Sequence, residues 1–288
     1  MVGSGPPQTI DASSSDLLLY LNPVFMVRQL WGHRSLIRQF TRREIESRYR
    51  GSFLGLFWLL VHPLVQLVIY TFVFGIVFHS RWNRGESQSL TQFALILFCG
   101  LITFNIFSEC VSRASTMIVA VPNYVKKVVF PLEILPVCRL GTALFHALIN
   151  LLVLLVANLL VNQTIQWTVL LLPLAILPLI FLSLGLSWFL ASLGVFLRDL
   201  SHIIGLVMLV LFYASAIFYP IEVVPPFAQS IIHFNPLAAI VANVRNVTLW
   251  GLMPNWLELG FWLVVSLVLM MLGYAWFMKT KSAFADVI

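Results

Sequence analysis

The sequence predicts an all-α integral membrane protein with six transmembrane helices, and two observations lead to this fold class. First, 60% of the 288 residues are hydrophobic and only 10% are charged, whereas a soluble domain carries about 25% charged residues. Second, residues 51–78 contain no Asp, Glu, Lys or Arg. A helix of that length reaches about 42 Å, enough to cross a hydrocarbon core of about 30 Å. No soluble domain of any size is expected.

The basic residues determine the predicted orientation, because the cytoplasmic flanks of membrane spans are enriched in Lys and Arg. Most of the 17 basic residues fall in four short segments, which are residues 28–50, 113–139, 198 and 279–281. We expect these segments and both termini in the cytoplasm, and Arg81, Arg84 and Arg245 on the other side. This placement accounts for the net charge of +6 without a nucleic-acid partner.

Two segments precede the first span. Residues 1–26 are expected to form a flexible tail, rich in Gly, Pro and Ser at its start, without the features of a signal peptide. Residues 27–50 are expected to form one amphipathic helix at the cytoplasmic membrane interface, with i,i+4 ion pairs Glu44–Arg48 and Glu46–Arg50. A basic flank with no further role is the alternative. The arginines at the centre of this segment are Arg38, Arg42, Arg43, Arg48 and Arg50.

The transmembrane domain is expected to occupy residues 51–288, with spans at about residues 52–78, 92–112, 140–161, 167–197, 201–219 and 259–278. Pro63 is expected to kink the first span. Glu109 and Arg113, near the inner end of the second span, are spaced to pair across one helical turn. Ser183, Ser187 and Ala191 give the fourth span a face of small residues, which favours close helix packing.

Residues 220–246 do not read as a further span. Prolines and an asparagine divide them into pieces of about a dozen residues or fewer, too short to cross singly. Because the last span should end in the cytoplasm, this segment must begin and end outside. We therefore expect a re-entrant pair of short helices, since irregular backbone at membrane depth needs surrounding protein or a water-filled path. An external loop lying flat on the membrane is the alternative.

The chain lacks the motifs of an enzyme or an ATPase. Its glutamates lie far apart, its six histidines form no recognisable motif, and its three cysteines lack metal-ligand spacing. His62 and His146 lie inside spans, where such residues more often serve packing than catalysis. No lysine follows a glycine, so a Walker loop cannot form. Neither a cofactor nor a metal is expected in this chain, and ATP hydrolysis for active transport would belong to a partner.

Aromatic side chains are plentiful, with 23 Phe, 9 Trp and 7 Tyr. Aromatic rings present flat apolar surfaces that can stack on sugars, so rings within the spans are candidates for guiding a glycan. Contact with lipid and interfacial belts is the alternative explanation for any single ring. The candidates for a channel lining are Tyr70, Phe74, Phe104, Phe107, Tyr213, Phe218 and Tyr219.

Six motifs, in order, resemble those of the ABC-2 type permeases that export polysaccharides. They are RREIESRYRGSFLGLFWLLVHPL at 42–64, VPNYVKKVVFPLEILP at 121–136, FLRDLSH at 196–202, SAIFYP at 215–220, FNPLA at 234–238 and FADVI at 284–288. Each motif alone is weakly specific, whereas their shared order over residues 28–288 is strongly specific. The chain looks most similar to the O-antigen, capsule and teichoic-acid export permeases.

This resemblance implies a homodimer of six-span subunits in the bacterial cytoplasmic (inner) membrane. Two copies of a separate ATPase, which binds ATP and Mg²⁺, would power outward movement of a lipid-linked glycan. Residues 113–139 would form the loop that couples to the ATPase. The arginines of residues 27–50 would meet anionic membrane lipid or the pyrophosphate of the carrier lipid. Contacts to the ATPase are implied for Asn123, Tyr124, Lys126, Lys127, Phe130, Pro131, Glu133, Arg198 and Asp199.

The predicted function is therefore that of the transmembrane permease subunit of an ABC exporter for a lipid-linked polysaccharide. An ABC-2 permease for a small lipid or drug would share the fold, and only the aromatic content and the details of the motifs argue against it. An integral-membrane glycosyltransferase acting on the same lipid would need a pair of catalytic acids, which the sequence does not offer.

Overall fold

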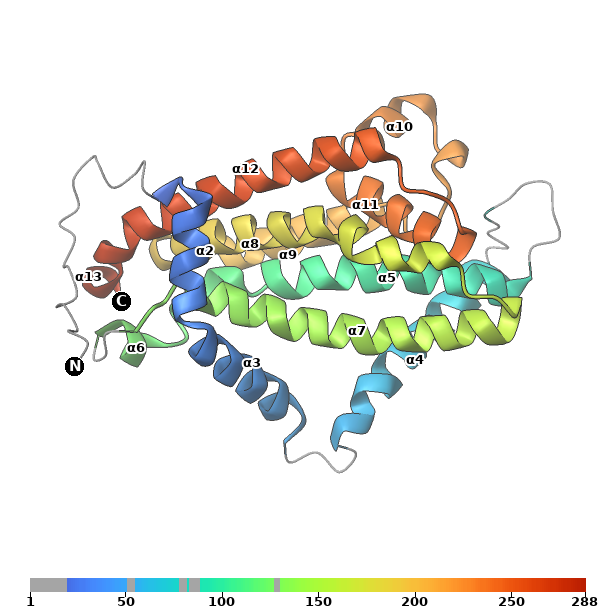
Figure 1. Cartoon of the computed structure of the whole chain (residues 1–288). Helices are drawn as coiled ribbons and strands as arrows, with labels where there is room; N and C mark the ends of the chain where they lie inside the picture. The colour runs from blue at the N-terminus through green and yellow to red at the C-terminus, as the bar shows by residue number, and fades with distance from the viewer. Residues whose placement is uncertain (1–19, 51–54, 78–81, 83–88, 127–129) are drawn as a thin grey trace.

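The computed structural model describes residues 20–50, 55–77, 82, 89–126 and 130–288. This part of the chain forms helices and connections without strands, as the sequence predicts. With their helical extensions, four helices are long and apolar enough to cross a membrane. They lie side by side in Figure 1 and are α5 (Leu90–Val111), α7 (Ile134–Asn162), α8 (Leu172–Phe196) and α12 (Trp256–Thr280).

The expected first and fifth spans appear as shorter apolar helices. After the 3₁₀ turn η1 (Gly55–Phe57), α4 (Trp58–Tyr70) continues as a π-helix, η2 (Thr71–Val77). Helix α9 (Leu200–Ala214) ends before the expected boundary at residue 219. It ends there because Ala216 has a left-handed backbone conformation, with φ of 49°, which a right-handed helix cannot contain.

The third span also begins earlier than expected. Helix α7 starts at Ile134 rather than at residue 140, and Pro136 therefore lies in its first turn. A proline is tolerated there because the first backbone N–H groups of a helix have no partner within the helix. The coupling loop predicted over residues 113–139 is accordingly shorter, and α7 reaches into it.

Several segments that are far apart in sequence meet at one end of the bundle, here called the α6 end (Figure 1). In Figure 1 this end lies on the left, beside the C-terminus. A Cβ atom on Gly194, near the end of α8, would lie 2.0 Å from the carbonyl oxygen of Ser115, so α8 also reaches this end. The α6 end contains η3 (Ala114–Thr116), α6 (Pro122–Lys126), the α8–α9 turn, η7 (Lys281–Ala283) and α13 (Phe284–Val287).

Within the described residues 20–50, the chain forms two helices rather than one. Helix α2 (Pro23–Gly32) begins within the expected flexible tail, because the side chain of Asn22 accepts hydrogen bonds from the first turn and Pro23 stands at its first position. The chain leaves helical geometry at His33 and re-enters it in α3 (Arg34–Tyr49). The expected helix over residues 27–50 is therefore divided at His33.

The segment 220–246 is divided at its prolines, as predicted. The turn η5 (Ile221–Val223) leads to α10 (Pro226–His233) and α11 (Pro236–Arg245), and a π-helix, η6 (Asn246–Trp250), follows. Helix α11 is largely buried and contacts α5, α8 and α12, whereas α10 exposes Phe227 and Ile231. The short helices thus differ, since one belongs to the core and the other lies on the surface.

Both ends of α11 hold the C-terminal turn of α9. The side-chain amide of Asn235 donates a hydrogen bond to the backbone carbonyl of Ala214 at 3.0 Å. The guanidinium of Arg245 donates to the carbonyls of Ile96, Ala216 and Ile217 at 3.2, 2.9 and 2.8 Å. Arg245 is 2% exposed and its charge lies 4.3 Å from the ring centre of Trp82. Arg245 is expected on the outer side of the membrane, and its side chain is buried in the protein interior.

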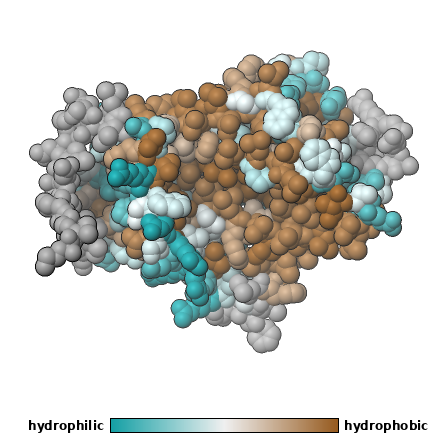
Figure 2. All heavy atoms as spheres, viewed as in Figure 1, coloured by the Kyte–Doolittle hydropathy of each residue, from teal (hydrophilic) through white to brown (hydrophobic). Residues whose placement is uncertain are grey.

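Apolar side chains cover much of the middle of the surface in Figure 2, and hydrophilic side chains gather toward its ends. Exposed apolar side chains include Leu152, Val156 and Leu160 on α7, and Leu206 and Val210 on α9. A continuous apolar surface of this kind is rare on soluble monomers and suits contact with lipid or another protein. The three cysteines, Cys99, Cys110 and Cys138, are buried beneath it.

Helices α8 and α12 pack closely against each other. A Cβ atom on Gly273 would lie 2.1 Å from the carbonyl oxygen of Gly185, and one on Gly185 would lie 2.7 Å from Leu269 and Met270. These glycines allow the two backbones to touch. The small-residue face predicted for the fourth span is buried, since the exposed fraction is at most 1% for Ser183, Ser187 and Ala191.

We expect Gly273→Leu to lower the free energy of unfolding by about 2 kcal/mol, because the added side chain overlaps the backbone of α8. Gly260→Leu is the matched control on the same helix, since no atom lies within 4 Å of the added Cβ. Thermal unfolding of the purified variants in detergent measures both effects. Equal unfolding midpoints would contradict the packing described for α8 and α12.

Candidate functional site

The coupling segment is anchored to α3 through aromatic rings. Tyr124 of α6 stacks on Phe130, with ring centres 4.8 Å apart. Phe40 of α3 contacts both rings, at 5.9 Å from Tyr124 and 5.1 Å from Phe130. Because all three rings are half-buried, the two predicted coupling residues Tyr124 and Phe130 also join α6 to α3. A displacement of α6 would therefore act directly on α3.

The outward-facing residues of this segment are Asn123 and Lys126, which are exposed on α6, and Pro131, which is half-buried. Lys127, the remaining predicted coupling residue of the segment, lies outside the described residues. Arg198 and Asp199 are exposed in the turn between α8 and α9. The fold brings this turn and α6 to the same end of the bundle, as their predicted common role requires (Figure 1).

Glu133 has a different environment from the other predicted coupling residues. Its side chain is buried and accepts hydrogen bonds from the amide of Gln29 at 2.9 Å and from the ammonium of Lys281 at 2.6 Å. Its carbonyl oxygen accepts a hydrogen bond from the indole N–H of Trp188 at 2.9 Å. Glu133 therefore joins α2, α8 and the C-terminal segment from inside, and a surface contact with a partner does not fit its burial.

The arginines of α3 are all exposed, but two of them have partners that differ from the predicted ones. Arg42 pairs with Glu46 at 2.7 Å and Arg48 pairs with Glu109 of α5 at 2.5 Å. Glu44 forms an ion pair with Arg139 of α7. The predicted pairs Glu44–Arg48 and Glu46–Arg50 are thus wrong. Within the described residues, no ion pair is formed by Arg38, Arg43 or Arg50.

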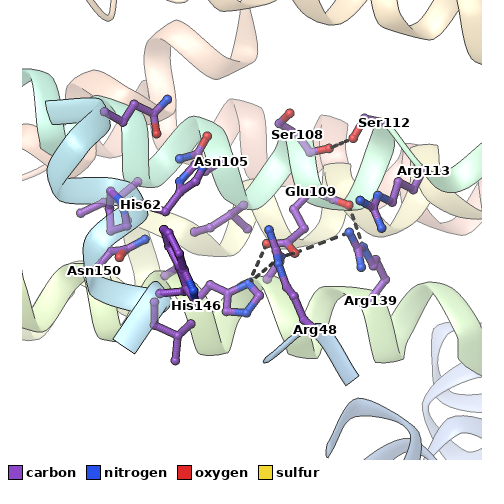
Figure 3. A pocket seen from close by; sticks show the side chains of 18 of the residues that line it. Arg48, His62, Asn105, Ser108, Glu109, Ser112, Arg113, Arg139, His146 and Asn150 are labelled. Atoms are coloured by element: carbon purple, nitrogen blue, oxygen red, sulfur yellow. Dashed lines mark hydrogen bonds and ion pairs between the residues drawn. The ribbon is translucent and has the colours of Figure 1, made fainter. Parts of the chain in front are cut away.

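Glu109 is the centre of the ionic contacts between α3 and the bundle (Figure 3). Its carboxylate lies 2.5 Å from Arg48, 3.5 Å from Arg139 and 3.0 Å from Nδ1 of His146. The other ring nitrogen of His146 lies 3.1 Å from the hydroxyl of Tyr49, whose pKa is raised by burial. The predicted pairing of Glu109 with Arg113 is therefore replaced by contacts with two other helices, α3 and α7.

A cavity of about 300 Å³ adjoins this ionic cluster, between α3, α4, α5 and α7. This cavity was not predicted from the sequence. The signal was a polar residue repeated at a spacing of four positions in three apolar segments: His62 and Gln66, Asn105 and Glu109, and His146 and Asn150. Such spacing places both members of a pair on one helix face, but only the fold shows that the three faces converge.

The candidate channel aromatics form a cluster rather than an open lining. Phe104, Phe107 and Phe218 are buried, and Phe212 lies 5.1 Å from Phe104 and 5.0 Å from Phe218. Tyr70 lies 5.3 Å from Phe218. Tyr213 is exposed. Its backbone carbonyl accepts a hydrogen bond from the hydroxyl of Tyr219, which is half-buried. The side chain of Phe74 lies outside the described residues.

We expect Glu109→Gln to lower the free energy of unfolding by about 2 kcal/mol, because Arg48, Arg139 and His146 lose a partly buried carboxylate. Amide hydrogen exchange in α3 should also become faster. Glu46→Gln is the matched control, since the carboxylate of Glu46 forms an ion pair with the exposed Arg42 on the same helix. Unchanged exchange in α3 of the Glu109 variant would show that other contacts hold this helix.

Comparison with known proteins supports the family suggested by the motifs. Residues 35–249 match the family described as ABC-2 type transporter. The O-antigen export system permease protein RfbA of Myxococcus xanthus is 28% identical over 263 residues, covering 91% of this chain and 98% of the relative. A Klebsiella pneumoniae protein of the same name is 25% identical, covering 86% of this chain and 93% of the relative. The polysialic acid transport protein KpsM of Escherichia coli is 25% identical, with coverage of 84% and 92%.

The family match covers well over half of the chain and includes α3, the coupling segment, the ionic cluster around Glu109 and the divided segment with α10 and α11. Permeases of this family are multi-pass membrane proteins that act with an ATPase subunit. The apolar helices and the exposed turns at the α6 end agree with that architecture. The chain belongs to the ABC-2 type transporter family.

Proposed function

We propose that this chain is the transmembrane permease subunit of an ABC exporter that moves a lipid-linked polysaccharide, such as an O-antigen, across the bacterial cytoplasmic membrane. The observation that carries this proposal is similarity over 84% or more of the chain to proteins named for O-antigen export and polysialic acid transport. This similarity favours a polysaccharide over the alternative substrates, a small lipid or drug, and favours transport over glycosyl transfer.

The working unit is a homodimer with two copies of a separate ATPase, which holds ATP and Mg²⁺. In each subunit, α4 with η2 and α9 complete six crossings together with the four longer helices. The basic residues at the α6 end support a cytoplasmic location for this end and for both termini. Helices α10 and α11 then form the re-entrant pair at the outer side, and their short lengths support this assignment.

The ATPase contacts α6 and the turn between α8 and α9. The exposure of Asn123, Lys126, Arg198 and Asp199 supports this surface. Movement of the ATPase passes from α6 to α3 through the stacked rings of Tyr124, Phe130 and Phe40. At the surface of α3, the arginines that form no ion pair with the described residues meet anionic lipid or the diphosphate of the carrier lipid.

The sugar chain passes through a channel between the two subunits, along the aromatic cluster near the end of α9. Tyr213 is the candidate for direct contact because it is exposed. Buried Phe104 and Phe218 act indirectly by holding Tyr70 and Phe212 in place. Stacking on sugars is weakly directional, so successive units of a polymer can pass the same ring.

We expect Lys126→Glu to weaken the association with the cognate ATPase by about tenfold or more. An ATPase surface that is complementary to a lysine carries negative charge, so a glutamate at this position would face a like charge. Such a juxtaposition costs several kcal/mol of binding free energy. The control is Lys279→Glu, an exposed lysine on α12 at the same end. Co-purification of the complex at low and moderate salt gives the measurement. Equal losses in both variants would indicate a general charge effect rather than a contact at α6.

Transport is tested directly by reconstitution into liposomes. We expect a lipid-linked glycan to move from one leaflet to the other only when the permease, the ATPase and ATP are all present. A parallel preparation with a catalytically inactive ATPase is the control for passive movement. Modification of the lipid by the permease alone would instead support the glycosyltransferase, and ATP-dependent movement of small lipids but not of the glycan would support the second alternative.

A further inference from the structure

The cavity between α3, α4, α5 and α7 has two chemically distinct halves (Figure 3). Asn105 and Glu109 lie one turn apart on α5, about 6 Å at about 1.5 Å per residue, and Arg113 follows just beyond the end of this helix. The half near Arg113 also contains Glu109, Arg48 and Arg139, and is therefore charged. The half near Asn105 is lined by neutral polar groups of α4, α5 and α7. A ligand that fills both halves would need an ionic part and a neutral polar part.

The neutral half contains polar side chains that form no hydrogen bond within the described part of the chain. His62, Gln66, Asn105 and Asn150 line it, and none of their side chains forms a hydrogen bond with another described residue. The side-chain oxygen of Asn150 is buried without a partner. The unpaired, buried oxygen of Asn150 costs free energy. The half-buried Gln66 and Asn105 and the exposed His62 line the same cavity from α4 and α5. Their convergence therefore indicates a site that becomes satisfied when a ligand binds.

The ligand chemistry follows from these groups. Amide and imidazole side chains both donate and accept hydrogen bonds, which suits hydroxyl groups, since each hydroxyl does the same. Trp58 lies at the edge of the cavity with 43% of its surface exposed, and an indole ring can cover the apolar face of a sugar. A volume of about 300 Å³ lies at the lower limit of small-molecule sites, so it suits one sugar rather than a polymer.

The charged half has surplus capacity for an anion. Arg139 and Arg48 are engaged by Glu44 and Glu109, but Arg113 forms no ion pair with the described residues. Arg48 remains 50% exposed on its side chain. Guanidinium groups bind phosphate with charge-assisted hydrogen bonds. The order of groups along α5 thus matches a sugar joined to a phosphate, with the sugar toward Asn105.

We propose that this cavity, inside a single subunit, is a binding site for the sugar that is attached directly to the lipid diphosphate. The identity of the lipid carrier rests on the proposed function, whereas the hydroxyl chemistry of the site rests on the unpaired side chains of α4, α5 and α7. In this arrangement, Asn105 and Asn150 recognise the sugar, and Arg48 and Arg113 hold the phosphate. The site would let the exporter select the lipid-linked end of its substrate.

The test compares binding of two probes to the purified full-length permease in lipid nanodiscs. One probe is a prenyl diphosphate that carries a single hexose, and the other is the same prenyl diphosphate without the hexose. We expect wild type to prefer the hexose-bearing probe, by about twofold to tenfold for each hydrogen bond to a hydroxyl. Asn105→Leu and Asn150→Leu should each reduce this preference and leave affinity for the bare diphosphate unchanged. Arg48→Gln should weaken both probes.

The matched control is Asn162→Leu, the same substitution at the other end of α7 and outside the cavity, which should keep the preference. The unfolding midpoints of the two cavity variants should not fall, because each substitution removes an unpaired amide. An equal affinity of wild type for both probes, or a preference kept by both cavity variants, would overturn the sugar site. Phosphatidylglycerol that displaces the bound hexose probe as effectively as unlabelled hexose probe does would also overturn the sugar site. The cavity would then be a site for a lipid headgroup.

ATP-dependent export by the wild-type complex is measured separately in liposomes and decides the proposed function. Export that persists when the probes show no sugar preference would reject only the cavity site. Absence of export together with a clear preference for the hexose probe would reject the export function while keeping the site. The two proposals therefore fail in distinguishable ways.

Discussion

Polar groups among apolar helices need partners inside the protein, because a hydrocarbon surrounding offers none. This requirement explains the least regular parts of the fold. Arg245 donates to the carbonyls of Ala216 and Ile217, where the chain leaves α9 in a left-handed turn, and to the carbonyl of Ile96 on α5. Glu133 lies at the junction between α6 and α7, where its carboxylate accepts hydrogen bonds from Gln29 and Lys281. At both places, one buried charged side chain joins segments that have no continuous secondary structure.

The attachment of α3 follows from the same requirement and connects the two candidate sites. Arg139 is held between Glu44 on α3 and Glu109 on α5, while the rings of Phe40, Tyr124 and Phe130 join α3 to the coupling segment. One face of α3 therefore contacts α6 and another borders the polar cavity. A movement imposed at α6 would therefore act on α3, which also lines the cavity.

The sequence predicted what depends on hydropathy and local backbone rules. The apolar segments, the division at Pro226 and Pro236 and the family motifs were identified in this way. The ion pairs of α3 were not, because i,i+4 spacing indicates only which side chains share a helix face, and partners from α5 and α7 were available to Glu44 and Arg48. The environment of Arg245 could not be predicted either. Its hydrogen-bond acceptors are backbone carbonyls, and every residue has one, so the sequence does not mark them.

The burial of all three cysteines has a practical consequence for labelling experiments. Thiol reagents act on accessible sulfur, and here Cys99, Cys110 and Cys138 lie within the bundle. The natural cysteines should therefore react little with labelling reagents. A single cysteine can be introduced on an exposed turn for site-directed spectroscopy without first removing them. A membrane-impermeant maleimide, applied to sealed vesicles of either orientation, would then report the sidedness of each turn directly.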